Sequence, residues 1–407
     1  MRTGYCAAAA LIAALILAGS STARADAVTG WNARAGEVIL AAGIGTPPAN
    51  RIMAMVQTAV YEAANRVTGS HPENSLNLET APGASVEAAI AAANCVVLKK
   101  MIPAQSALID RQYEAALAAI PDGPAEARGV AIGTRAAEAV LAMRADDHAM
   151  QPVPYRPATA PGVYVPTTMP AVVQWPRRKP WLMQSASQFR PGPPPALESP
   201  LWARDYNEVR TLGAREGSTR SDEQTAIARF WEGTLPTVYH GVIRSVADQP
   251  GRDLTRNARL FAAATQAMDD ALIAVFDAKY HYNFWRPITA IRNGDNDRND
   301  ATARDELWLP LIETPMHPEY PCAHCIIAAA VATVISADVG RGPMPRLETK
   351  SDVVDAVRSW ATPEDLIREV SLARIYDGVH YRNSTEVGAQ MGRRIGHLAA
   401  AKYPAPP

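Results

Sequence analysis

Residues 49–66, ANRIMAMVQTAVYEAANR, carry the clearest structural signal in the chain. Apolar side chains recur there at intervals of three and four residues: Ile52, Met55, Val56, Ala59, Val60 and Ala63. That spacing places them on one face of an α-helix. Residues 84–101, 105–119 and 124–146 repeat the pattern, and no segment shows a convincing strand alternation. The sequence therefore predicts an all-α protein.

The second half of the chain is expected to be helical as well. Residues 221–247 and 251–279 have the pattern of two long helices joined at a proline-glycine turn. Further helices are expected to begin at Cys322, Thr362 and Asn383. The second of these starts is well marked, because threonine is a good N-cap and a proline follows it at the first helical position.

A proline-rich block, residues 151–200, separates the two helical regions. It holds 13 of the 33 prolines, and each proline inside a helix would cost about 3 kcal/mol, so the block cannot be helical. It also carries large apolar side chains, among them Tyr155, Tyr164, Trp175, Trp181, Met183 and Phe189. Disordered linkers are poorer in such residues, so we expect an ordered, extended strap lying across the helices.

The first 25 residues have the layout of a secretory signal peptide. Arg2 precedes an apolar run from Cys6 to Ala18, and the small-residue site Ala23-Arg24-Ala25 follows. We expect cleavage after Ala25 and a secreted or periplasmic protein without membrane insertion, the alternative being a retained N-terminal anchor.

Composition narrows the class of protein. The chain has 407 residues, 48% of them hydrophobic, which excludes general disorder. Its net charge of −1 argues against a nucleic-acid binder that works through a broad basic surface. Four cysteines are too few for a disulfide scaffold.

Basic residues and histidines gather in three places. These are Lys279-Tyr-His-Tyr-Asn-Phe-Trp-Arg286-Pro287, then Pro321-Cys322-Ala323-His324, and then Arg374-Ile-Tyr-Asp-Gly-Val-His380. Taken singly, such residues are more often solvated charges, helix caps or buried histidines. We expect Lys279 and Arg286, two helical turns apart, to share one helix face. The middle cluster would place the free N–H groups of a helix N-terminus beside these cations, which together suit a tetrahedral oxyanion.

The three clusters resemble the signature of the type 2 phosphatidic acid phosphatase and vanadium haloperoxidase superfamily, usually K-x6-R-P, P-S-G-H and S-R-x5-H-x3-D. Similarity to its soluble haloperoxidase-like branch extends to Trp31-Asn32 and to residues 193–199, 205–208 and 222–231. The resemblance implies two packed four-helix bundles. With it the chain divides into a signal peptide (1–25), an N-terminal helical bundle (26–150), the strap (151–200) and a catalytic helical domain of this superfamily (201–407).

In the haloperoxidases of this superfamily the bound anion is vanadate. The positions that carry over as vanadate-binding residues are Lys279, Arg286, Cys322, Ala323, Arg374 and His380. The resemblance implies that His380 is the axial nitrogen ligand and that Ala323 donates its backbone N–H. It implies that His324 is the acid–base group for peroxide, with His317 and Phe276 beside the halide. The substrates would be hydrogen peroxide, a halide and an organic acceptor.

A secreted acid phosphatase or phosphotransferase is the alternative. In that reading the pocket holds phosphate, His380 forms a phospho-histidine with a phosphate ester, and His324 protonates the leaving group. A third reading is a homologue that binds an oxyanion without catalysis.

The chain departs from the usual signature at four positions. Cys322 and Ala323 replace serine and glycine, Ala373 replaces serine, and Ser384 replaces the aspartate that orients the nucleophilic histidine of phosphatases. A thiol is a weak hydrogen-bond donor that peroxide can oxidise, which counts against peroxidase turnover. The missing aspartate counts against the phosphatase, and whole-chain similarity favours the haloperoxidase.

Cys322 and Cys325 form a C-x-x-C pair at an expected helix start. Such a pair can be a redox dithiol, part of a zinc site with His317 and His324, or a disulfide in an oxidising compartment. We hypothesise that a disulfide would protect or regulate the anion site.

Overall fold

The computed structural model describes residues 26–71, 76–233 and 236–405, so the expected signal peptide lies outside the described residues. The chain is mainly helical, and the predicted all-α class is confirmed. The helices before the strap are α1 (Ala27–Ala41), α2 (Thr46–Thr68), α3 (Val86–Met101), α4 (Ser106–Leu117) and α5 (Pro124–Met143). Those after it are α6 (Pro200–Leu212), α7 (Asp222–Phe230), α8 (Pro236–Ala247), α9 (Leu254–Tyr282), α10 (Pro287–Arg292), α11 (Ala323–Val339), α12 (Pro363–Tyr376) and α13 (Arg382–Lys402). Across the described ranges, no helix is both long and apolar enough to cross a membrane.

The expectation that the chain lacks strands is wrong for residues 347–360. Strands β1 (Leu347–Lys350) and β2 (Val357–Trp360) pair antiparallel, with Leu347 opposite Trp360. Residues of β1 alternate between buried and exposed, as strand residues should. Four residues are too few for that alternation to stand out from chance in the sequence.

The single helix expected over residues 221–247 is also wrong. Helix α7 ends at Phe230, and α8 begins at Pro236. A proline inside a helix removes a hydrogen bond and clashes with the preceding turn, whereas the first turn of α8 tolerates it. Gly233 and Pro236 were the sequence signals for this break.

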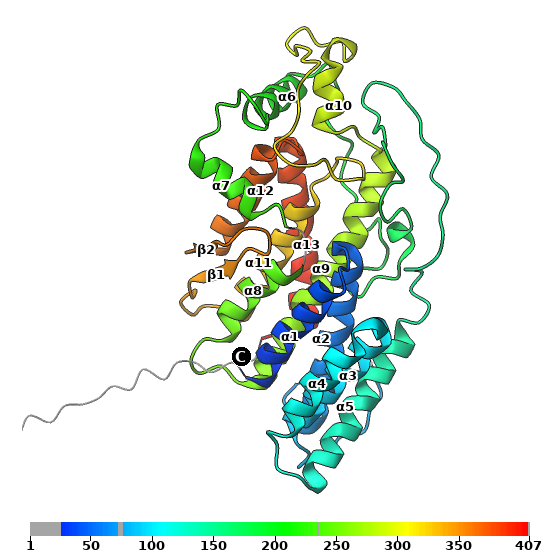
Figure 1. Ribbon diagram of the computed structural model, residues 1–407, viewed down its shortest axis with the longest axis vertical. Coiled ribbons are helices and arrows are strands. Elements are labelled where there is room, and N and C mark those ends of the chain that lie inside the picture. The colour runs from blue at the N-terminus through cyan, green and yellow to red at the C-terminus, as the bar shows by residue number, and fades with distance from the viewer. Residues whose placement is uncertain (1–25, 72–75, 234–235, 406–407) are drawn as a thin grey trace, which may run out of the picture.

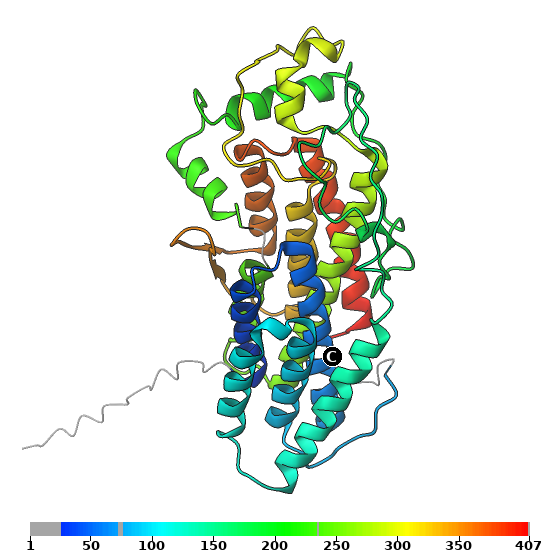
Figure 2. The same ribbon diagram turned by 45° about the vertical axis from the view of Figure 1, so that its right-hand side comes forward.

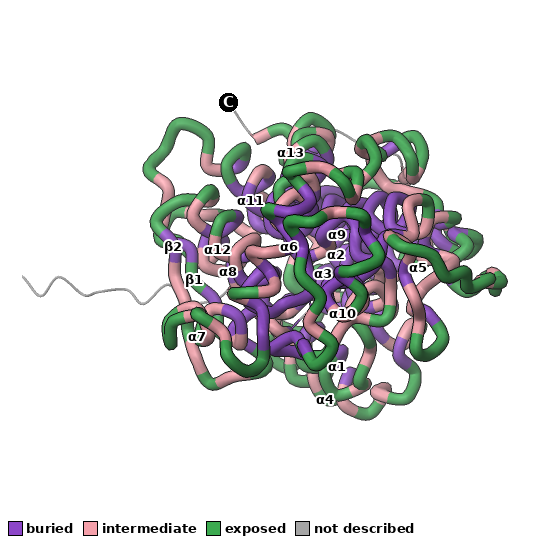
Figure 3. Tube along the Cα trace, turned by 90° about the horizontal axis from the view of Figure 1, so that it is seen from above, coloured by how far each residue is buried: buried purple, intermediate pink, exposed green. Residues whose placement is uncertain are grey.

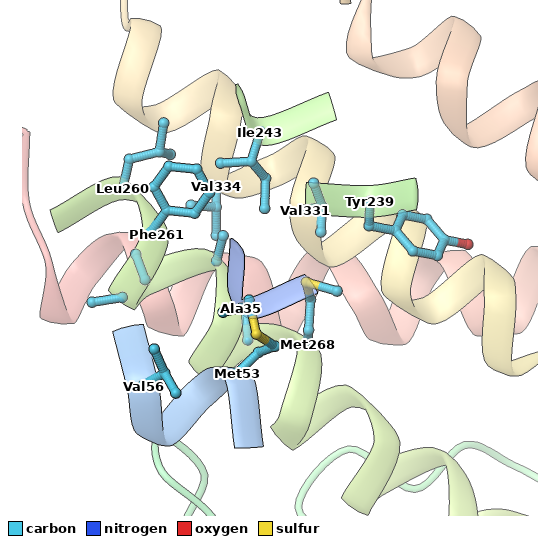
Figure 4. Packing of buried hydrophobic residues seen from close by; sticks show 14 of the residues in the cluster. Ala35, Met53, Val56, Tyr239, Ile243, Leu260, Phe261, Met268, Val331 and Val334 are labelled. Carbon is cyan, nitrogen blue, oxygen red and sulfur yellow. The ribbon is translucent and has the colours of Figure 1, made fainter. Parts of the chain in front are cut away.

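One core joins helices from before and after the strap. Figure 4 shows Ala35 of α1 and Met53 of α2 close to Met268 of α9, with side chains of α8 and α11 above them. Seen from above in Figure 3, the buried stretches gather around α2, α3 and α9, and the exposed ones lie outside them. Figure 1 shows α3, α4 and α5 at one end of the molecule and α6 and α10 at the other. The boundaries expected for the separate domains stay a prediction.

The proline-rich block is an ordered strap that follows α9 (Figure 2). Its Tyr164, Trp175 and Met183 are buried, and Trp175 begins a single 3₁₀ turn that ends at Arg177. The strap therefore packs against the helices and is no flexible linker.

Carboxylates of α9 hold this strap. Asp270 accepts hydrogen bonds from three successive backbone N–H groups, those of Trp181, Leu182 and Met183, at 2.7, 2.8 and 2.9 Å. Next to it, Asp269 forms a fully buried ion pair with Arg178. Asp277, two turns further along α9, accepts two hydrogen bonds from Arg190 at 2.7 and 2.8 Å. A segment without regular structure thus has its backbone and charges satisfied by one helix.

We predict that Asp270→Asn destabilises the protein most at low pH. Burial raises the pKa of Asp270 to about 6, although the three N–H groups lower it. Between pH 3.8 and 6 the folded protein keeps a proton that the unfolded chain releases, so this group's contribution to stability falls as pH rises. The asparagine also turns an N–H₂ group toward backbone donors, a loss of about 1–3 kcal/mol.

Urea unfolding at pH 4 and pH 7 measures this effect. The variant should be less stable than wild type at pH 4, and the difference in free energy of unfolding should narrow at pH 7. The exposed Asp122→Asn is the control and should change stability by less than about 0.5 kcal/mol. Equal stabilities of wild type and Asp270→Asn at pH 4 would contradict the role of Asp270.

Candidate active site

The three predicted clusters meet at one place in the fold. Lys279 lies near the end of α9, Arg286 is the N-cap of α10, and Arg374 and His380 flank the turn between α12 and α13. All four side chains are at most 1% exposed. The alternative of solvated charges is therefore excluded for Lys279 and Arg286.

Lys279 and Arg286 converge by a different route from the one the sequence suggests. They do not share a helix face, because α9 ends at Tyr282 and Asn283 adopts a left-handed conformation with φ of 49°. Asparagine tolerates this conformation better than most residues. Both cations instead bind the segment before α11. Lys279 Nζ donates to the carbonyls of Pro318 and Glu319 at 3.0 and 2.7 Å, and Arg286 Nε donates to that of His317 at 2.9 Å.

The turn between α12 and α13 sets the distance between Arg374 and His380. The backbone N–H of His380 donates to the Arg374 carbonyl at 3.2 Å. Gly378 makes this possible with φ of 77°, and a Cβ atom there would lie 2.4 Å from the Gly213 carbonyl oxygen. Helix α12 accordingly ends at Tyr376, two residues before Gly378. The Arg374 side chain donates to the Trp231 carbonyl at 2.7 Å and pairs with Asp377.

Helix α11 begins beside this turn. Its N-cap is Cys322, whose sulfur accepts the N–H of Cys325 at 3.1 Å and is also bonded to the sulfur of Cys325. Gly388, Gly392 and Gly396 of α13 let the helices approach closely, because a Cβ atom at each would lie within 2.6 Å of an atom of α11 or of its N-cap residue Cys322. The backbone N–H of Cys322 donates to the Ser384 carbonyl at 3.2 Å.

The two cysteines of the C-x-x-C pair form a disulfide. Both cysteine side chains are fully buried, and their sulfurs are bonded to each other. The zinc alternative is therefore wrong, and within the described ranges no group of His, Cys, Asp and Glu side chains could hold a metal ion. Cys322 also has no S–H with which to replace the serine hydroxyl of the usual signature.

A cavity of about 320 Å³ opens between these elements. Most of the predicted site residues line it: Phe276, His317, Ala323, His324, Arg374 and His380. Leu272, Ile327 and Pro47 make much of the remaining wall apolar, and Ala171 of the strap completes it. Larger surface hollows of about 480 and 460 Å³ contain none of the predicted site residues. The small cavity is therefore the candidate site.

Buried positive charge dominates the electrostatics of the site. Burial lowers the pKa of Lys279 well below its usual value, and the charges of Arg286 and Arg374 lower it further. The pKa of His380 is likewise lowered by burial and then by Arg286 and Lys279. The pKa of His324 is lowered by burial and then by Arg374. A bound anion would offset the repulsion that these groups share.

The donors at the site fit a tetrahedral oxyanion. Arg374 Nε is buried and has no hydrogen-bond partner among the described residues. Lys279 has three N–H donors and gives two of them to carbonyls. His324 and Ala323 line the cavity at the N-terminus of α11, where N–H groups are free to bind an anion. Vanadate and phosphate both suit this donor set.

Glu319 is the functional candidate that the sequence reasoning missed. Its side chain is fully buried, and its Oε1 lies 2.7 Å from His380 Nδ1 and 3.2 Å from the backbone nitrogen of Tyr381. Burial raises the pKa of Glu319 to about 7, while Lys279 and Arg286 act in the opposite direction. The signal was weak, because Glu319 stands five residues before His324, away from the position four residues after His380 where the signature places a carboxylate.

The site residues are thus brought together, and their individual roles stay predictions. His324, Arg374 and His380 reach the cavity directly. Arg286 contacts it through its neighbours, since its Nη1 lies 3.4 Å from His380 Nε2 and its Nη2 lies 3.0 Å from His317 Nδ1.

Comparisons with known proteins show which proteins this chain resembles. Residues 259–405 match the family model of the second helical-bundle domain of vanadium chloroperoxidase (VCPO). The vanadium chloroperoxidase of Curvularia inaequalis is 30% identical over an alignment that covers 30% of this chain and 24% of that relative. This chain therefore aligns with only about a quarter of that protein's length.

Solved structures extend the similarity to nearly the whole chain. The first bacterial vanadium-dependent iodoperoxidase is 25% identical, with a TM-score of 0.76, covering 92% of this chain and 96% of that one. A holo-type bacterial vanadium-dependent chloroperoxidase, 18% identical with a TM-score of 0.70, covers 94% of both chains and shares the fold. The resemblance to vanadium haloperoxidases is confirmed, and within it residues 259–405 match the second helical-bundle domain of these proteins.

We predict that the folded protein without residues 1–25 holds one free thiol. Cys95 is the free cysteine of the described residues, because Cys322 and Cys325 are bonded to each other. Titration with a thiol reagent after unfolding should therefore count one thiol, and three after prior reduction. Three thiols without reduction would rule the disulfide out.

Proposed function

We propose that this protein is a vanadate-dependent haloperoxidase-like enzyme that oxidises a halide with hydrogen peroxide. The observation that carries this proposal is the position of His380, a neutral imidazole among three buried cations beside the N-terminus of α11. When bound, vanadate would supply a V(V) Lewis acid that polarises peroxide. The similarity of nearly the whole chain to a vanadium-dependent iodoperoxidase supports the proposal.

The residues of this chain would bind and orient the reactants. Lys279, Arg286 and Arg374 would hold the anion through charge-assisted hydrogen bonds, and His380 would be its nitrogen ligand. His324, whose pKa is lowered by burial, would move protons to and from peroxide. Phe276 and His317, whose ring centroids are 5.1 Å apart, form the wall beside which the halide would bind.

Export through the expected signal peptide is part of the proposal. The Cys322–Cys325 disulfide supports it, because disulfides persist in oxidising compartments such as the periplasm. In the disulfide form, the sulfur beside the site also offers no thiol for peroxide to oxidise.

A phosphatase that works through a phospho-histidine is the second candidate. Glu319 favours it, because this carboxylate contacts His380 Nδ1 in the way that the phosphatase signature assigns to the aspartate missing at Ser384. His380 Nε2 would attack the phosphate ester, and His324 would protonate the leaving alkoxide.

We predict that His380→Ala removes halide oxidation. Purified protein saturated with vanadate should halogenate an organic acceptor when peroxide and halide are supplied, and the variant should lose more than about 100-fold in rate. His397→Ala, an exposed histidine of α13, is the matched control and should keep wild-type activity. Absence of peroxide-dependent iodide or bromide oxidation in vanadate-saturated wild type would contradict the proposal.

The same preparations test the phosphatase. Vanadate-free protein would hydrolyse an aryl phosphate, vanadate would inhibit it, and acid quenching would trap phosphate on His380. We expect the hydrolysis to be slow relative to halide oxidation. Rapid hydrolysis with a trapped phospho-histidine and no halide oxidation would establish the second candidate instead.

A further inference from the structure

The ring of His380 is held on both sides by groups that fix its tautomer. Arg286 Nη1 lies 3.4 Å from Nε2, and an arginine can only donate. On the other side, Glu319 Oε1 lies 2.7 Å from Nδ1 and already accepts the backbone N–H of Tyr381. The proton therefore belongs on Nδ1, and the lone pair belongs on Nε2 among the buried cations.

We infer that Glu319 is the positioning residue of the site, which holds His380 as the Nδ1–H tautomer so that Nε2 can ligate the central atom of the oxyanion. This inference deepens the proposed function and rests on it. The carboxylate comes from the segment before α11 and replaces the aspartate that the usual signature carries on the helix of the histidine itself. Ser384, which occupies that position here, has its Oγ 3.5 Å from Nδ1, too far for a strong hydrogen bond.

The backbone of Glu319 is fixed by the same elements that carry the cations. Its N–H donates to the Phe284 carbonyl at 2.9 Å, and its own carbonyl accepts from Lys279 Nζ at 2.7 Å. Phe284 lies between the end of α9 and Arg286. These hydrogen bonds therefore fix the position of the Glu319 backbone relative to Lys279 and Arg286.

The charges around Glu319 partly offset the cost of burying it. Burial raises its pKa, whereas Lys279, Arg286 and the Ser384 side chain act in the opposite direction. The carboxylate therefore lies beside the buried cations, with Oε1 turned toward His380 Nδ1.

The charge of Glu319 and its positioning of His380 predict opposite effects on anion binding when the carboxylate is removed. The negative charge of Glu319 repels an anion, so removing it should tighten the binding of a purely electrostatic ligand. Ligation through Nε2 requires the right tautomer, so the same change should weaken the binding of vanadate. Inorganic phosphate, which binds through charge and hydrogen bonds, is therefore the reference for vanadate.

The test measures the affinities of orthovanadate and inorganic phosphate for the purified full chain by titration calorimetry. Glu319→Leu should weaken vanadate binding by about 10–100-fold and leave phosphate binding unchanged or tighter. Adding Ser384→Asp to Glu319→Leu should restore most of the vanadate affinity, because it returns a carboxylate to Nδ1. Glu313→Gln, whose side chain is 96% exposed, is the control and should change neither affinity.

Glu319→Gln provides a second test that can be used if the Glu319→Leu variant does not fold. The Tyr381 N–H should hold the amide oxygen in place of Oε1, so this variant should keep the tautomer and bind vanadate within about 10-fold of wild type. Equal weakening of both anions in a folded Glu319→Leu, or unchanged vanadate binding, would overturn the inference.

The tautomer itself gives a readout independent of turnover. Nitrogen NMR of protein with labelled imidazoles should show His380 as the Nδ1–H form, assigned by its loss in His380→Ala among the eight histidines. Glu319→Leu should shift it toward the Nε2–H form, and an unchanged spectrum would overturn the inference. If these shifts and the vanadate effect occur while halide oxidation is absent, the proposed function fails and the role of Glu319 stands.

Discussion

The contact of the Lys279 ammonium with the carbonyls of Pro318 and Glu319 ties the site together. It joins the end of α9 to the segment that leads into α11, and both Lys279 and Glu319 are fully buried. Because the buried ammonium would lose these partners if it moved, the contact fixes the chain before α11 relative to α9. Arg286 makes a similar contact with the same segment, because it donates to the carbonyl of His317, the residue before Pro318. These two cations thus hold the segment before α11 through its backbone carbonyls.

Side chains of helix α9 bind the backbone of the strap, as they bind the backbone of the segment before α11. On one part of the helix, Asp269, Asp270 and Asp277 bind the charges and backbone N–H groups of residues 178–190. At its end, Lys279 binds carbonyls. Ala171 of the strap reaches the cavity wall, so the proline-rich segment also shapes the access to the site. The aspartates of α9 thus accept hydrogen bonds from the strap, and Lys279 donates hydrogen bonds to the segment before α11. Together they satisfy polar backbone groups of two segments that lack regular secondary structure.

Two departures from the usual signature change the chemistry near His380 in different ways. Cys322, which replaces the serine, forms a disulfide with Cys325. Its sulfur still accepts the N–H of Cys325 and so caps the N-terminus of α11. The serine that replaces aspartate leaves Nδ1 without its usual carboxylate, and Glu319 occupies that place from another segment. The three motifs alone could indicate the cations and histidines, since their types and spacing are local properties. They could not indicate Glu319, because its partner is 61 residues away in the chain.

By itself the sequence determined the helical class, the starts of α11 and α12, the ordered nature of the strap and the identity of the cations. These follow from apolar periodicity, capping residues, proline content and a spaced motif, all of which act over a few residues. Only the tertiary structure decided that Lys279 and Arg286 meet through carbonyls of residues 317–319, that α7 and α8 are separate, and that Glu319 faces His380. The physical reason is that burial and hydrogen-bond partners over long separations depend on how the helices pack, which local patterns do not record.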